Sequence, residues 1–394
     1  MKKTDTEQIR LANKKQIINY LRVHGPIARV DLGQALGLSP ATVTAITSEL
    51  QQEGRLIEHP ATSEKTNTRG RPRVLIDLAP ETVHVLGLKL SINELRMQLG
   101  NHKGQVSDTM VVELDTRALS TEGLFDAMAS AVRRFNASLP KNKRPKALGI
   151  AVQGVINGLD GNIIWSPALQ DKQIPLKSQL EKRIQLPVTV ANDANCLAMA
   201  IQHQPKYQSL TDFAVIMLGY GIGMGMFING ELHLGHHGAS AEFGHTKYLP
   251  EGAQCLCGKR GCIEAYVGDY ALYRDASALF PMHHEDSLHP TEDSMQSLVD
   301  QADAGSIELQ NLFLRTGRVL GHGISNLIAL LSLEKIVISG PGSRSYHLMQ
   351  PGLQSGLEES LVSELIADTK IELAPWDEDM TIKGIVVLAL QTID

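Results

Sequence analysis

The chain has 394 residues, of which 43% are apolar and 4% aromatic, and a formal net charge of −6. This length exceeds what one ordinary hydrophobic core accommodates, so we expect two or three domains. No stretch reaches the roughly 20 apolar residues of a membrane span, and no apolar run follows the first residues, so we expect a cytoplasmic protein without a membrane span. Sparse aromatic residues argue against a sugar site walled with tryptophan.

The charge is unevenly distributed along the chain. Residues 1–80 carry 12 Lys and Arg against 8 Asp and Glu, whereas residues 81–394 carry 25 against 35. A mildly basic first domain on an acidic body is typical of a nucleic-acid reader joined to a part that does not contact DNA.

Three short helices are predicted at the start, over residues 9–24, residues 29–36 and a stretch that begins after Ser39. The third helix has one apolar face and one face of small, polar side chains, and a glycine turn precedes it. This pattern is typical of a helix-turn-helix, in which small side chains let the recognition helix enter a major groove. The predicted DNA contacts are Ser39, Pro40, Ala41, Thr42 and Thr44. The alternative is an ordinary surface helix.

A pair of strands is predicted next, over residues 55–58 and 74–78, with a polar, arginine-rich connection. Together they form the wing of a winged helix-turn-helix domain over residues 1–80. Arginines beside Gly and Pro can enter a minor groove, so Arg69, Arg71 and Arg73 are candidate DNA contacts. The alternative for this arginine cluster is a solvated linker.

Strands and helices alternate from residue 83 onward, which predicts an α/β body over residues 81–394. A buried strand over residues 187–191 leads into Asn192 and Asp193 at the start of a helix. Polar residues at this place are often ligand contacts, although either could simply cap the helix. Alternating glycines over residues 219–225 suit close approach of a ligand to the backbone, and they suit a plain β-hairpin equally well.

A compact set of metal-ligand residues lies between Glu242 and Glu264. Three thiols and an imidazole in the spacing His-x9-Cys-x-Cys-x4-Cys form a complete tetrahedral donor set for a structural zinc ion. The predicted ligands are His245, Cys255, Cys257 and Cys262. The alternative is three thiols near an unrelated histidine, while a disulfide is disfavoured in a cytoplasmic protein.

Taken together, these motifs resemble the ROK family (repressors, open reading frames and kinases), and specifically its sugar-responsive repressors of the Mlc/NagC type. The resemblance covers essentially the whole chain. Its most specific part is the knuckle from Gly244 to Glu264, supported by residues 192–195, the glycine loop 219–225 and the helix-turn-helix at 37–44.

The resemblance implies an actin/hexokinase-like body of two lobes, with hinges near residues 195–215 and again near 375–385, and a sugar in the cleft. It also implies which residues contact sugar hydroxyls: Asn192, Asp193, Glu242, His245 and Glu264. In the kinase members the residue that matches Asp193 is the catalytic base.

This sequence departs from the kinase members at the phosphate loops. Lys89 to Asn93 stand where kinases carry an Asp-x-Gly-x-Thr-like loop, and Tyr220 replaces a small hydroxyl residue. Phosphoryl transfer depends on positioned phosphates with neutralised charge, so we expect no enzyme and assign no catalytic residue.

The expected function is a transcriptional regulator, most simply a repressor, of carbohydrate-metabolism genes. It would bind operator DNA as a homodimer or homotetramer and respond to a small-molecule sugar inducer. Two alternatives stay open: an ATP-dependent sugar kinase, or a repressor controlled by a transport-system protein partner instead of a free sugar. Three carboxylates in one cleft favour a neutral hexose or an amino-sugar derivative over a sugar phosphate.

Overall fold

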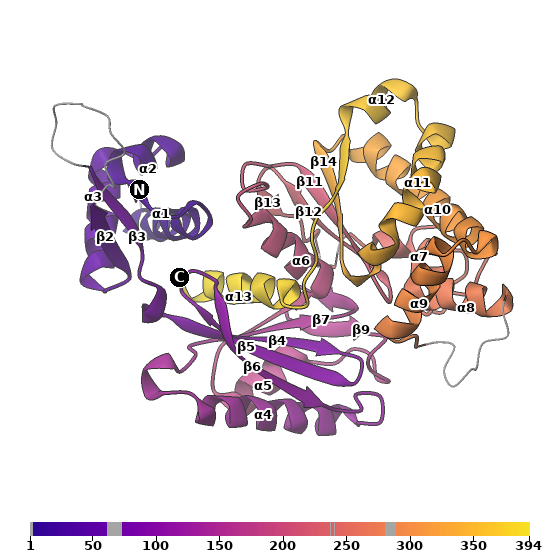
Figure 1. The fold of residues 1–394 in the computed structure, drawn as a ribbon. Coiled ribbons are helices and arrows are strands. Elements are labelled where there is room, and N and C mark those ends of the chain that lie inside the picture. Colours follow the sequence, from indigo (N-terminus) through magenta and orange to yellow (C-terminus); the bar gives the residue numbers. More distant parts are fainter. Residues whose placement is uncertain (1–2, 61–72, 237, 240, 280–288) are drawn as a thin grey trace.

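The computed structural model describes residues 3–60, 73–236, 238–239, 241–279 and 289–394. A small N-terminal domain stands to one side of a larger body that has two lobes, each built on its own sheet (Figure 1). No helix within these described ranges is long and apolar enough to cross a bilayer.

The N-terminal domain, here called the reader, consists of three helices and a small antiparallel sheet of strand order β1-β3-β2. Its elements are α1 (Lys3–His24), β1 (Ile27–Ala28), α2 (Arg29–Leu36), α3 (Pro40–Gln52), β2 (Leu56–Pro60) and β3 (Val74–Leu78). Apolar residues at helical spacing, among them Ile17, Leu21, Val43, Ile46 and Leu50, meet in one core. The three predicted helices and the wing strands are therefore confirmed, and β1 is an additional strand that the sequence did not suggest.

Local signals set the turn between α2 and α3. Gly37 ends α2 in the left-handed conformation, with φ of 64°, which glycine adopts without strain. Ser39 then caps α3 by accepting a hydrogen bond from the Thr42 amide at 3.2 Å, and Pro40 is the first helical residue. The wing tip, residues 61–72, lies outside the described ranges, and with it the predicted contacts Arg69 and Arg71.

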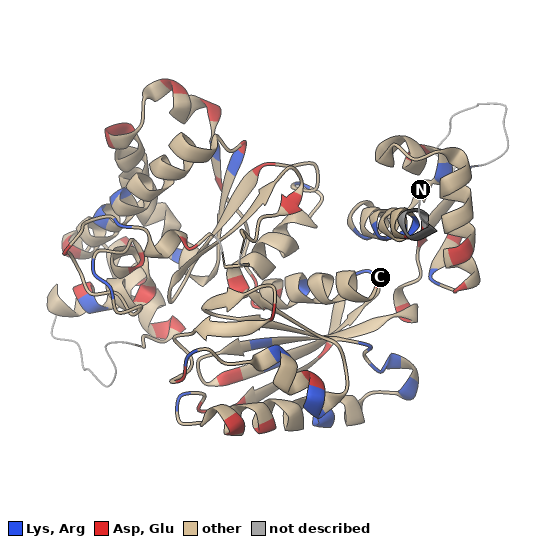
Figure 2. Ribbon diagram, turned by 180° about the vertical axis from the view of Figure 1, so that it is seen from behind, with Lys and Arg blue, Asp and Glu red and all other residues tan. Residues whose placement is uncertain are grey.

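The first lobe is a five-stranded sheet of order β10-β7-β4-β5-β6. Its elements are β4 (His84–Ser91), β5 (Glu94–Asn101), β6 (Val106–Glu113), α4 (Thr121–Ser138), β7 (Leu148–Val152), β8 (Val155–Asn157), β9 (Asn162–Trp165), α5 (Leu176–Ile184) and β10 (Val188–Asn192). Helices α4 and α5 cover one face, and Arg183 of α5 pairs with Glu122 and with Asp126 of α4. Figure 2 shows both signs of charge along α4, on the side of the lobe away from α13.

The second lobe has a five-stranded sheet of order β13-β12-β11-β14-β15. Its strands are β11 (Phe213–Leu218), β12 (Ile222–Ile228), β13 (Glu231–Leu232), β14 (Lys335–Ser339) and β15 (Lys370–Leu373). Its helices are α7 (Glu264–Val267), α8 (Asp269–Leu279), α9 (Glu292–Asp303), α10 (Ile307–Leu331), α11 (Tyr346–Ser360) and α12 (Ser363–Asp368). Short 3₁₀ turns are η1 (Pro80–Thr82), η2 (Lys141–Lys143), η3 (Phe243–His245) and η4 (Pro341–Ser345).

Two helices join the lobes, α6 (Asp193–Gln202) and α13 (Met380–Ile393). They pack so closely that a Cβ added at Gly384 of α13 would lie 1.7 Å from the Cys196 carbonyl oxygen of α6. On its other side α13 lies on the sheet of the first lobe, where a Cβ added at Gly149 of β7 would lie 2.7 Å from the Ile385 carbonyl oxygen. The α/β body and its strands match the expectation, while the domain limits and the two hinges stay predictions.

Candidate functional site

A cleft of about 470 Å³ lies between the two lobes. All five residues that the family resemblance implied as sugar contacts line it: Asn192, Asp193, Glu242, His245 and Glu264. They come from the end of β10, the start of α6, the turn η3 and the start of α7. The fold therefore brings side chains that are up to 72 positions apart in the sequence to one surface.

Asn192 and Asp193 divide two roles at the start of α6. The Asn192 side chain caps the helix, because its Oδ1 accepts hydrogen bonds from the amides of Ala194 at 2.8 Å and Asn195 at 3.3 Å. Its Nδ2 donates to the Gly154 carbonyl oxygen at 2.7 Å and so holds the loop after β7. The capping alternative is thus real for Asn192, while Asp193 lines the cleft with one oxygen, Oδ1, accepting from the Ala194 amide at 3.0 Å.

The cleft disfavours negative charge on two of its carboxyls, those of Asp193 and Glu242. Burial raises the pKa of Asp193 to about 6, opposed by the positive charge of Lys89 and reinforced by Glu264. Burial, with the nearby charges of Asp193 and Glu264, likewise raises the pKa of Glu242 to about 7. Carboxyls in this state can both donate and accept hydrogen bonds, as binding of hydroxyl groups requires.

Glu264 joins the cysteine-rich loop to the glycine loop between β11 and β12. Its Oε2 accepts a hydrogen bond from the Ile222 amide at 3.1 Å, and its Oε1 lies 3.4 Å from the Cys255 sulfur. A Cβ at Gly221 would lie 2.6 Å from Oε2, so glycine is required for this approach. Gly221 therefore leaves the space that the Glu264 carboxylate occupies beside the loop.

Four potential metal ligands gather beside the cleft. The ligand atoms of His245, Cys255, Cys257 and Cys262 all lie within 4.8 Å of one another. The Cys255 sulfur is 3.7 Å from His245 Nδ1, and the sulfurs of Cys257 and Cys262 are 3.8 Å apart. A tetrahedron with Zn–S bonds of about 2.3 Å has edges of about 3.8 Å, so the spacing fits a metal-bound set, and it is far from a disulfide bond of about 2.05 Å.

His245 connects this cluster to the cleft. While Nδ1 faces the sulfurs, Nε2 lies 3.9 Å from a Glu242 carboxylate oxygen, and the ring lies edge-on to Trp165 at 5.9 Å between centroids. One imidazole can therefore bind a metal through one nitrogen and contact a ligand through the other.

Comparison with known proteins agrees with both parts of this architecture. The model of the ROK family matches residues 85–392, and a winged helix-turn-helix DNA-binding model matches residues 10–57. The chain belongs to the ROK family.

Several curated relatives of similar length are named as repressors. The DNA-binding transcriptional repressor Mlc of Escherichia coli (strain K12) is 25% identical over 96% of this chain and 93% of its own length. The xylose repressor of Caldicellulosiruptor bescii is 24% identical over 96% of this chain and 95% of its own length. Both relatives thus span the reader as well as the body.

Solved structures show the same fold. A ROK family transcriptional regulator, a homologue of the E. coli Mlc protein, superposes with a TM-score of 0.81 and 24% identity over 97% of each chain. A ROK family glucokinase from Streptomyces griseus, solved with glucose and AMPPNP, superposes with a TM-score of 0.66 and 25% identity over 78% of this chain and 99% of its own. The body is therefore shared with kinases.

Several cleft residues were missed from the sequence. Both tryptophans of the chain, Trp165 and Trp376, line the cleft, so the expectation of a site without tryptophan walls was wrong. Low aromatic content says nothing about where the few aromatic residues lie. The sequence did contain a signal that could have identified both tryptophans as cleft residues. Trp165 ends a short strand before Ser-Pro, and Trp376 directly follows a proline after β15.

The residues that depart from the ROK kinases face the same cleft. Lys89, at the end of β4, lines it with its ammonium 5.9 Å from the centroid of the Trp376 ring. Tyr220 lines it too, and its hydroxyl lies 2.8 Å from His289 Nδ1. A cation and a bulky ring therefore stand where the kinase resemblance implies phosphate loops.

The predicted DNA contacts of the reader form one surface where the structure describes them. Ser39, Pro40, Ala41 and Thr44 are exposed at the start of α3, and Thr42 beside them is half-buried. Arg73 is exposed and pairs with Asp31 of α2 at 3.1 Å. The helix thus presents small polar side chains outward, while its apolar face is in the core.

Proposed function

We propose that this protein is a DNA-binding transcriptional regulator, and specifically a repressor, of carbohydrate-metabolism genes, controlled by a sugar bound in the cleft. The observation that carries the proposal is the union, in one chain, of an exposed helix-turn-helix face with a cleft lined by hydroxyl-binding carboxyls. Two relatives that span both parts are named as repressors, one of them for xylose.

Recognition of the sugar is assigned to the five clustered side chains. Asp193, Glu242 and Glu264 exchange hydrogen bonds with hydroxyl groups, and Asn192 and His245 add further polar contacts. Trp165 and Trp376 offer apolar faces against the sugar ring, as aromatic side chains in ligand sites commonly do. A neutral hexose or amino-sugar derivative suits carboxyls that already resist negative charge better than a sugar phosphate does.

Zinc is the metal that we assign to the cysteine-rich loop. Three thiolates and one imidazole leave no open position, so its role is structural. By fixing His245 and Cys262, the ion would hold the segments that carry Glu242 and Glu264, because Glu242 lies 3.9 Å from His245 and Glu264 follows Cys262 by two residues.

The reader is assigned the operator contacts, through α3 and the arginines of the wing. Helix-turn-helix proteins usually bind two half-sites about one or two helical turns apart, which supports a homodimer or homotetramer in the cytoplasm. The expected contacts remain Ser39, Pro40, Ala41, Thr42 and Thr44, with Arg69, Arg71 and Arg73.

A sugar kinase is the second candidate, favoured by the Asp193 carboxyl at the position of the kinase base and by the shared fold. Lys89 argues against it, because a fixed cation at the first phosphate loop stands where the acidic, metal-side residue is needed. The protein is therefore proposed to bind a sugar without phosphorylating it.

A thermal-shift screen of neutral and phosphorylated sugars, with and without ATP, tests the proposal together with selection of bound fragments from fragmented genomic DNA. We expect one sugar class to raise the melting temperature without ATP, and to release the selected fragments. Sugar-dependent formation of ADP would establish the kinase instead. If DNA fragments are selected but no sugar raises the melting temperature or releases them, control by a protein partner such as a transport component would be favoured.

A further inference from the structure

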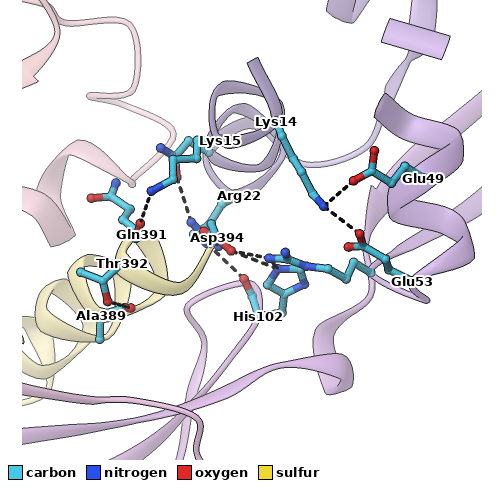
Figure 3. A network of polar contacts seen from close by, with 12 residues as sticks. Lys14, Lys15, Arg22, Glu49, Glu53, His102, Ala389, Gln391, Thr392 and Asp394 are labelled. Atoms are coloured by element: carbon cyan, nitrogen blue, oxygen red, sulfur yellow. Dashed lines mark hydrogen bonds and ion pairs between the residues drawn. The ribbon is translucent and has the colours of Figure 1, made fainter. Parts of the chain in front are cut away.

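The reader is joined to the body by a buried ionic contact at the end of α13 (Figure 3). One carboxylate oxygen of Asp394 accepts a hydrogen bond from Arg22 Nη2 of α1 at 2.8 Å, and the other accepts from Arg55, which precedes β2. His102, in the turn after β5, lies with Nε2 at 3.7 Å from the same carboxylate. Two reader cations and one body histidine therefore converge on one body anion.

This contact is almost free of solvent. The side chains of Arg22 and His102 are 0% exposed and that of Asp394 is 1% exposed. Burial works against the charged carboxylate, but the nearby His102 and the positive charges of the hydrogen-bonded Arg22 and Arg55 hold the pKa of Asp394 at about 2. A buried ion pair that loses one partner leaves an uncompensated charge, so the arrangement strongly favours a single geometry.

Arg22 is also fixed on both sides of the junction. Its Nε donates to the His102 carbonyl oxygen at 3.1 Å, and its Nη1 donates to Asn19 within α1 at 2.9 Å. Lys15, two turns earlier on the same face of α1, donates to the carbonyl oxygen of Gln391 at 3.4 Å. The Asp394 contact is thus the strongest polar link between α1 and α13 among the described residues.

Within the reader, α1 is tied to the recognition helix. Lys14 donates to Glu49 of α3 and to Glu53 directly after it, each at 2.8 Å (Figure 3). Its ammonium is well shielded, with 14% of the side chain exposed. When α1 is displaced, α3 therefore moves with it, and the exposed face of α3 is the expected DNA contact.

At its other end, α13 begins close to the cleft. Trp376, four residues before the helix begins, lines the cleft, and α13 packs on α6, whose first residue is Asp193. A Cβ added at Gly384 would lie 1.7 Å from the Cys196 carbonyl oxygen, and one added at Gly149 would lie 2.7 Å from the Ile385 carbonyl oxygen, so α13 is closely packed on both sides. A 14-residue helix of about 21 Å thus runs from beside the cleft to the reader, in close contact with α6 and with the first-lobe sheet.

We propose that Asp394 is the positioning residue that holds the reader on α13, so that the helix behind the cleft also sets where the DNA-contacting face lies. Movement of α6 or of the first-lobe sheet on ligand binding then displaces α13, and with it Arg22, Arg55 and α3. The regulatory consequence rests on the proposed function, whereas the attachment of the reader does not.

The attachment is tested by a distance measurement on the full-length, zinc-loaded protein. Spin labels are introduced through a non-natural ketone amino acid at two exposed positions, Gln34 in α2 and Ala137 in α4, so that the four cysteines stay unlabelled. Pulsed electron resonance then gives the distribution of reader-to-body distances. We expect a narrow distribution in the wild type and at least a twofold broader one in Asp394→Asn. The matched control, Thr392→Ala, changes a side chain that only contacts Ala389 and Thr189 of the body, and should match the wild type.

A second pair of variants guards against failure of Asp394→Asn to fold. Arg55→Gln removes the charge at a more accessible partner, with 13% of its side chain exposed, and should broaden the distribution. Arg55→Lys keeps the charge and should restore most of the narrow distribution. A wild-type distribution in both Asp394→Asn and Arg55→Gln would overturn the proposal, as would equal broadening by Arg55→Lys and Arg55→Gln.

The coupling is tested with the DNA fragment that the wild type selects and the sugar that raises its melting temperature. In the wild type the sugar should weaken DNA binding. In Asp394→Asn the ratio of the dissociation constants for DNA with and without sugar should fall to within twofold of one. The affinity for the sugar should be unchanged. An unchanged ratio would overturn the coupling. If no fragment is selected, the proposed function fails, while the distance measurement still decides the attachment.

Discussion

At the scale of single residues, the Asp193 carboxyl makes the stability of the ligand-free protein depend on pH. Burial raises its pKa from 3.8 to about 6, so the folded state binds a proton in the range where the unfolded state has lost it. Stability from this group is therefore present below about pH 4 and is lost as the pH rises through about 6. A shift of about two pKa units corresponds to roughly 3 kcal/mol as an upper value.

Asp193→Asn removes this dependence, because an amide resembles the protonated carboxyl and does not titrate. We expect the variant to gain stability over the wild type by up to roughly 3 kcal/mol between pH 4 and pH 8. Urea unfolding of both proteins at intervals of one pH unit measures the difference, and titrations shared by both cancel. A difference that stays constant over this range would show that Asp193 is ionised in the fold throughout.

The metal assignment leads to a second prediction. Cys257→Ser replaces one thiolate by a poor zinc ligand, so we expect less than one zinc ion per chain, a lower melting temperature and a weaker sugar-induced thermal shift. Cys196→Ala is the matched control, since this thiol is buried outside the cluster and should leave the zinc content unchanged. Element analysis gives the zinc content directly. Full zinc content together with an unchanged sugar response in Cys257→Ser would refute the assignment.

Spacing made the metal cluster predictable, since three of its four ligands lie within eight residues of one another. The side chains that wall the cleft were harder to predict. Lys89 and Trp376 are 287 positions apart, and only the pairing of lobes places the ammonium 5.9 Å from the ring. Periodicity identifies which element a residue belongs to, but it contains no information on which elements of two separate sheets face each other.

At the scale of elements, the close packing of α13 on α6 is open to test. In Gly384→Ala the added methyl would meet the Cys196 carbonyl oxygen at 1.7 Å, so the helices must separate. We expect a loss of roughly 1–3 kcal/mol in unfolding free energy, as overpacking of a close-packed contact typically costs. Lys383→Ala, one position away on an exposed face of α13, should change it by less than about 0.5 kcal/mol.

Denaturant unfolding measures the free energy of unfolding of each variant, provided that its dependence on denaturant concentration is unchanged. If Gly384→Ala were as stable as the wild type, α13 would be able to shift freely. In that case α13 would be unsuited to transmit movement from the cleft. The distance distribution between Gln34 and Ala137, measured on the same variant, provides an independent readout of such a shift.

Elements with local signals were predicted well, and those with only distant partners were not. Ser39 and Pro40 define the start of α3, and the polar residues after β10 define the start of α6. Strand β1 has two residues and exists only because Ile27 and Ala28 pair with β3 nearly fifty positions later. The contact of Arg22 with Asp394 spans 372 positions, and neither residue belongs to a motif.

At the scale of the whole molecule, the reader and the cleft are two proposed binding sites near opposite ends of α13. The net charge follows the same division, with a basic reader on an acidic body, so DNA is attracted to one part and repelled by the other. A regulator of this form works if the arrangement that suits the sugar differs from the arrangement that suits DNA.

Thermodynamic linkage then makes a quantitative prediction about the intact protein. If the sugar weakens DNA binding by a given factor, the DNA must weaken sugar binding by the same factor, and couplings of this kind are typically about 1–3 kcal/mol, or 5- to 150-fold. Calorimetric titration of the sugar into the protein, alone and saturated with its selected DNA fragment, measures one factor, and titration of DNA with and without sugar measures the other. If the two factors are equal and exceed fivefold, the sugar and the DNA affect each other's binding through this protein alone. A factor near one in both titrations would mean that sugar and DNA bind independently, and control of DNA binding would then have to come from a partner protein.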